Sequence, residues 1–100
     1  MNTGELLPGL DYESALKEAQ TDQEGWNKAK TWVLEDYLVR RSGEVLQGPE
    51  KVRFDAIIRN SDIPEQLITL GEEYHLLENF DLQTESLRTY CRQHGKEPRF

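Results

Sequence analysis

The amino-acid sequence predicts an all-α fold: a compact single domain of four or five short helices around a central helix that contains both tryptophans. Three observations support this fold class. Apolar residues recur at the three- and four-residue spacing of one helical face through most of the chain. Residues that favour helix starts and stops stand at the edges of these stretches. The length, 100 residues, suits one small domain with a modest core.

We expect the central helix over residues 21–41, where apolar residues are densest. One helical face carries Trp26, Ala29, Val33 and Tyr37, and Trp32, Leu34 and Leu38 widen it. Aromatic side chains bury large areas, so the other helices should pack against this one. Thr21 is the expected N-cap, Glu24 completes a capping box, and Gly43 is expected to end the helix in a left-handed turn.

The N-terminal segments are predicted as a partly ordered leader followed by a short helix. Pro8 and Gly9 mark a turn. The leader also holds three leucines that should pack down or dock on a partner, Leu6, Leu7 and Leu10. Asp11 then caps a helix that runs to about residue 20. The predicted organisation is a leader over residues 1–10, a helical domain over residues 11–95 and a polar tail over residues 96–100.

A loop is expected over residues 42–48, and the nature of the next segment is ambiguous. Residues 50–59 are ambiguous. An alternation typical of a strand is formed by Val52, Phe54, Ala56 and Ile58. A helical face fits Lys51, Phe54, Ile57 and Ile58 equally well. We predict a helix that starts at Pro49, because the neighbouring segments are helical and a lone strand would have no partner.

Two more helices are expected in the C-terminal half. The first covers residues 63–79 with Asp62 as its cap, and Gly71 on its apolar face should let another helix approach closely. The second begins at Asp81 or Thr84 and runs to about residue 94, where a glycine follows it.

Composition excludes or disfavours several classes of function. The net charge is −7, which disfavours nucleic acid as a partner and favours a basic protein. No apolar run approaches the ~20 residues of a membrane-spanning helix, and the start of the chain lacks a signal-peptide pattern. Cys91 is the single cysteine, so no internal disulfide can form and a reducing, cytoplasmic location is expected.

The motifs that could carry chemistry are incomplete, so we predict no catalytic residue, metal or cofactor. Glu72 and His75 have the spacing of a metal-ligand pair in a helical bundle, but the second such pair is missing. Residues 43–48 follow the start of a phosphate-binding loop, but Pro49 and Glu50 replace its Lys and Ser or Thr. Cys91 shares an apolar stripe and is expected to be a small buried hydrophobe rather than a nucleophile.

The sequence therefore predicts a small, acidic, non-enzymatic protein that binds another protein as a regulator, adaptor, inhibitor or assembly factor. The acidic residues would steer the encounter, and an exposed apolar face would also suit a homodimer. The predicted protein-binding residues are Leu6, Leu7, Leu10, Glu72, Glu73 and Glu78. The alternative is a helix-turn-helix regulator of DNA that uses a basic row on the last helix, Arg88, Arg92 and Lys96.

Overall fold

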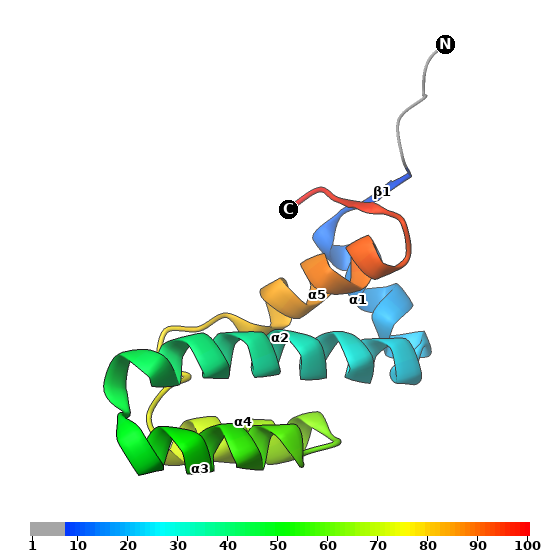
Figure 1. The fold of residues 1–100 in the computed structure, drawn as a ribbon. Coiled ribbons are helices and arrows are strands. Elements are labelled where there is room, and N and C mark those ends of the chain that lie inside the picture. The colour runs from blue at the N-terminus through cyan, green and yellow to red at the C-terminus, as the bar shows by residue number, and fades with distance from the viewer. Residues whose placement is uncertain (1–7) are drawn as a thin grey trace. The chain divides into compact units, whose positions relative to one another are not determined.

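Five α-helices and a two-stranded sheet make up residues 8–100, the part of the chain that the computed structural model describes (Figure 1). The elements are β1 (Gly9–Leu10), α1 (Tyr12–Thr21), α2 (Gln23–Val45), α3 (Gly48–Arg59), α4 (Pro64–Glu73), α5 (Leu82–Gln93) and β2 (Glu97–Pro98). The predicted all-α class is confirmed, and α2 contains both tryptophans. The two short strands add a small sheet that the sequence pattern did not indicate.

The helix α1 begins where the sequence predicts. The side chain of Asp11 accepts a hydrogen bond from the backbone N–H of Ser14 at 2.8 Å, which caps the first turn. Ala15 and Ala19 are fully buried on its inner face. The helix ends at Thr21, whose hydroxyl donates to the carbonyl of Glu18 at 2.8 Å.

The predicted ends of the central helix are wrong. Thr21 belongs to α1, and Asp22 caps α2 instead, because its Oδ1 accepts from the N–H of Gly25 at 3.1 Å. Gly43 lies inside α2 rather than ending it. The helical hydrogen bonds continue past it, since the N–H of Leu46 donates to the carbonyl of Ser42 at 2.8 Å. The predicted loop over residues 42–48 therefore shrinks to two residues.

The inner face of α2 differs from the predicted one at Trp32. This side chain is 60% exposed, whereas Leu34 and Leu38 are fully buried. Two positions along a helix differ by about 200° around its axis, so Trp32 and Leu34 point to nearly opposite sides. The other tryptophan, Trp26, is partly buried against the core of the first unit defined below. The apolar residues thus indicated the helix and the buried positions Ala29, Leu34 and Leu38 correctly, but not the outward direction of Trp32.

The ambiguous segment after α2 is helical, as predicted. In α3, Phe54 and Ile58 are buried one turn apart, while Val52 on another side is 66% exposed. A strand would have placed Val52 and Phe54 on the same face.

The helix α4 is shorter than predicted and has a different cap. Its N-cap is Ile63, and Asp62 makes no capping contact with its side chain. Instead the backbone N–H of Asp62 donates to the Oε1 of Gln66 at 3.1 Å. The helix ends at Glu73 rather than continuing to residue 79, because the chain adopts a left-handed conformation at His75 with a φ of 56°.

The helices belong to two compact units. The first unit comprises residues 8–29 and 81–100, which include α1, α5, the sheet and the start of α2. The second unit comprises residues 30–80, which include the rest of α2 together with α3 and α4. No helix within residues 8–100 combines the length and apolarity that crossing a membrane requires.

The first unit has a core between α1 and α5. Its buried members are Ala15, Ala19, Ala29, Leu87, Tyr90 and Cys91. The helix α5 starts at one of its two predicted caps, where the side chain of Asp81 accepts from the N–H of Thr84 at 3.1 Å. Beyond α5, the segment predicted as a polar tail pairs in parallel with β1, and Phe100 packs against the core.

The second unit buries side chains from α2, α3, α4 and the turn after α4: Leu34, Leu38, Phe54, Ile58, Leu67, Leu70 and Leu76. Gly71 allows the close approach that the sequence predicted. A Cβ at this position would lie 2.6 Å from the Cγ of Leu77 and 3.1 Å from the Cδ2 of Leu38, which lies on α2. Only a residue without a side chain permits this packing.

Candidate functional site

A groove of about 420 Å³ lies between α3 and α4 in the second unit, and we call it the α3–α4 groove. Both helices and the turn that joins them contribute to it. Its lining residues are Ala56, Ile57, Asn60, Ser61, Gln66, Thr69, Leu70 and Glu73. Because all eight come from residues 56–73, this groove is built within one unit.

The apolar part of the groove is one exposed side chain beside buried ones. Ile57 is 46% exposed, whereas Leu70 is only 5% exposed. Ile57 follows Phe54 by three residues, so it lies at the edge of the buried stripe of α3. An exposed isoleucine next to a hollow provides apolar surface that a partner side chain can cover.

In the polar part of the groove, three side chains each donate one hydrogen to a backbone carbonyl. The hydroxyl of Ser61 donates to the carbonyl of Ile57 at 2.8 Å. The Nδ2 of Asn60 donates to the carbonyl of Ala56 at 2.9 Å. The hydroxyl of Thr69 donates to the carbonyl of Glu65 at 3.0 Å. Oxygen acceptors therefore remain on these three side chains, and Asn60 also keeps one amide hydrogen.

One end of α4 is acidic. Glu72 and Glu73 are both exposed in its last turn, and the helix has no basic residue there. Negative charge at the C-terminal end of a helix opposes the helix dipole, so these carboxylates do not serve the stability of α4. Glu73 lines the α3–α4 groove, whereas Glu72 does not. Glu73 is also the one charged side chain of the lining.

The other predicted protein-binding residues lie elsewhere. Glu78 follows α4 in the turn, and one of its oxygens is 3.6 Å from the Nδ1 of His75. Leu10 lies in β1 and is partly buried against the core of the first unit. Leu6 and Leu7 fall outside the described residues. The structure thus brings Glu72 and Glu73 together and places Leu10 in a different unit from them.

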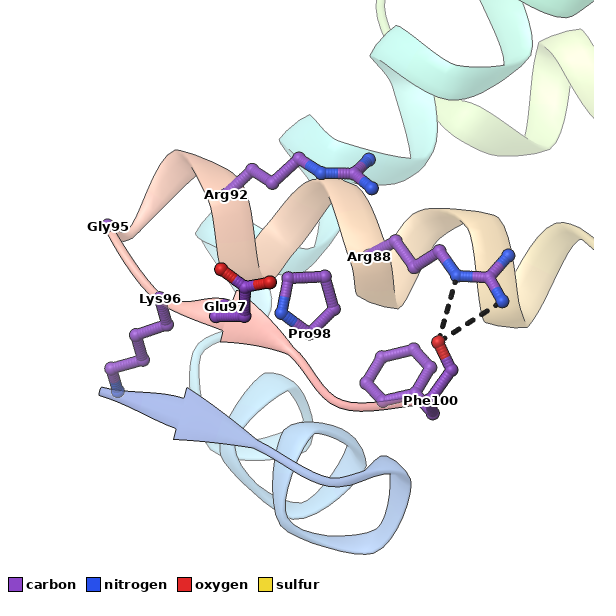
Figure 2. Close-up of a pocket in the computed structure, with 7 residues that line it drawn as sticks. All are labelled: Arg88, Arg92, Gly95, Lys96, Glu97, Pro98 and Phe100. Carbon is purple, nitrogen blue, oxygen red and sulfur yellow. Dashed lines mark hydrogen bonds between the residues drawn. The ribbon is translucent and has the colours of Figure 1, made fainter. Parts of the chain in front are cut away.

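The basic row predicted for the nucleic-acid alternative lines a second pocket, of about 320 Å³, beside α5 (Figure 2). Arg88 donates from Nε and Nη2 to the carbonyl oxygen of Phe100 and pairs with Glu85 at 2.7 Å. Lys96 pairs with Glu18 at 2.6 Å. These contacts give Arg88 and Lys96 structural roles in the first unit. DNA binding remains a prediction from the sequence.

A cluster around Asp22 also belongs to the first unit. Its Oδ2 accepts from the hydroxyl of Tyr90 at 2.9 Å and lies 3.3 Å from the Nε2 of His94. The hydrogen bonds from the N–H of Gly25 and from Tyr90 hold the pKa of Asp22 below its usual value. Burial, reinforced by the bond to Asp22, raises the pKa of Tyr90 to about 12. This cluster ties the corner between α1 and α2 to α5.

The residues that the sequence singled out for chemistry have structural surroundings. Cys91 is fully buried, and burial raises the pKa of its thiol, which keeps it in the protonated form. The prediction of a small buried hydrophobe is confirmed. Glu72 and His75 lie near each other in sequence, but no cluster of three or more His, Cys, Asp or Glu side chains within residues 8–100 is placed to hold a metal ion.

Apart from Glu73, the residues that line the groove carry no functional signal in the sequence. The sequence pattern groups Ile57 with the buried Phe54 and Ile58, but its exposure depends on where α4 packs. The polar lining has no signal in the sequence, since Asn60 and Ser61 are ordinary turn residues.

Comparisons with protein-family models, curated proteins and solved structures found no match to this chain.

Proposed function

We propose that this protein is a non-enzymatic binding module that docks a segment of another protein in the α3–α4 groove. The observation that carries the proposal is the juxtaposition of exposed Ile57 with the carboxylate of Glu73 on one hollow. Apolar contact would provide the affinity, and the acidic end of α4 would favour a basic partner and speed the encounter. The predicted leucines Leu6 and Leu7 would form a separate contact.

A pull-down with matched baits tests the proposal. Ile57→Ser removes the apolar edge of the groove, while Val52→Ser makes the same kind of change at an exposed position of α3 outside it. We expect one partner that the wild type and Val52→Ser retain from lysate and that Ile57→Ser loses. Mass spectrometry identifies the partner, and circular dichroism checks that both variants stay helical.

A second bait tests the role of charge. Simultaneous Lys substitution of Glu72, Glu73 and Glu78 should weaken capture of the same partner, because it reverses the field that steers a basic protein. Equal capture by the wild type, Ile57→Ser and the charge-reversed bait would overturn the proposal. Capture of an untagged copy of this chain as the one retained protein would overturn the proposal in favour of self-association.

A further inference from the structure

We infer that the α3–α4 groove takes the side chain of an arginine from the partner protein, an inference that rests on the proposed docking function and names its specificity. An arginine side chain has an apolar stem and a planar cationic head with five N–H donors. The groove offers a counterpart to each of these parts.

The stem of the arginine matches the apolar surface. Ile57 from α3 and Leu70 from α4 line the same hollow, and Ile57 is 46% exposed. The methylene groups of Arg or Lys commonly lie along such surfaces while the charged head reaches polar groups. A purely apolar side chain would gain the same contact but would leave the polar lining without partners.

The head of the arginine matches the acceptors. Glu73 is the charged group of the lining, and a carboxylate can accept two parallel hydrogen bonds from a guanidinium. Thr69 stands one helical turn before it, and its hydroxyl hydrogen is committed to the carbonyl of Glu65. Its oxygen is therefore available to accept from a donor-rich group.

The remaining polar groups are consistent with a donor ligand. Ser61 and Asn60 donate to backbone carbonyls of α3 and keep acceptor oxygens. Two amides also keep hydrogens: the Oε1 of Gln66 accepts from the N–H of Asp62 and leaves its NH2 group undonated, and Asn60 keeps one amide hydrogen. An anionic ligand would face Glu73 and these acceptors, so it is disfavoured.

The test uses a defined probe rather than an unidentified partner. The probe is a short alanine-based peptide amide with leucine and arginine one helical turn apart. Its control is the same peptide with citrulline in place of arginine, which keeps the shape and removes the charge. Titration into the isotope-labelled full chain, followed by NMR, should shift the amides of residues 57–73 only with the arginine peptide.

Variants locate the contact. Glu73→Lys should weaken binding of the arginine peptide by about tenfold or more, since it removes the paired carboxylate. Glu72→Lys makes the same change of net charge on the neighbouring residue outside the groove, and it should have a much smaller effect. Equal losses in the two variants would overturn the inference, because they would indicate a diffuse attraction to the acidic end of α4.

The outcomes also separate this inference from the proposed function. If both peptides bind equally and Ile57→Ser abolishes both, the groove docks a peptide but does not select arginine, so the inference fails and the proposed function stands. If neither peptide shifts residues 57–73 and Ile57→Ser retains its lysate partner, both fail.

Discussion

A single carboxylate, Asp22, serves three groups of the first unit at once. It caps α2 through the N–H of Gly25, accepts from Tyr90, and lies beside His94. Its contacts with Tyr90 and His94 connect parts of this unit that are distant in sequence. Loss of this side chain should therefore affect both a helix end and the attachment of α5.

We predict that Asp22→Ala lowers the midpoint of thermal unfolding at neutral pH. The folded-state pKa of Asp22 is depressed, so its stabilising contribution is present above the ordinary value of 3.8 and is lost as the pH falls through the depressed value. Urea denaturation over a range of pH should show the wild type and the variant converging in acid. Asp62→Ala is the control. A difference in the free energy of unfolding between the wild type and Asp22→Ala that stays constant with pH would contradict the prediction.

At the scale of helices, two glycines should respond in opposite ways to the same substitution. Gly71→Ala should lower the free energy of unfolding by about 1 to 3 kcal/mol, because the new methyl group overlaps the side chains of Leu77 and Leu38. Gly43→Ala should raise it by about 0.5 to 1 kcal/mol, since this glycine lies inside α2 and the nearest atom to an added Cβ is the Cε of Lys51 at 3.7 Å. Urea denaturation measures the free energy of unfolding of both variants. A higher value for Gly71→Ala than for the wild type would show that the close packing relaxes at little cost.

The existence of each helix was predictable from the sequence, but its ends were not. Spacing of apolar residues is a local property, and it correctly indicated all five helices, including the ambiguous segment of α3. The ends of a helix depend on competing local contacts. Asp22 rather than Thr21 supplies the cap of α2, and the helix continues through Gly43. The direction in which Trp32 points depends on packing that spacing alone does not determine.

At the scale of the whole molecule, the two units should lose stability separately. Leu87 and Leu67 are each fully buried, one in the first unit and one in the second. Truncation of either to Ala should cost about 2 to 5 kcal/mol. Hydrogen exchange should show that Leu87→Ala mainly lowers protection in α1 and α5, whereas Leu67→Ala mainly lowers it in α3 and α4. Uniform loss of protection in both variants would mean that the units unfold together.

The candidate site forms where two helices meet, which explains why the sequence indicated only Glu73 of its lining. The acidic end of α4 is contiguous in the chain, so Glu72 and Glu73 could be selected by their charge. The groove requires two helices to meet, and Ile57 becomes part of it only when α4 packs beside α3. No local pattern distinguishes an exposed isoleucine at such an edge from a buried one.

The parallel pairing of β1 with β2 has a consequence for the order of folding. Gly9 pairs with Glu97, so this sheet joins the first and nearly the last of the described residues. Residues 30–80, in contrast, form one uninterrupted stretch. The α3–α4 groove can therefore form through contacts within this stretch, whereas the sheet of the first unit forms only when segments far apart in the sequence meet.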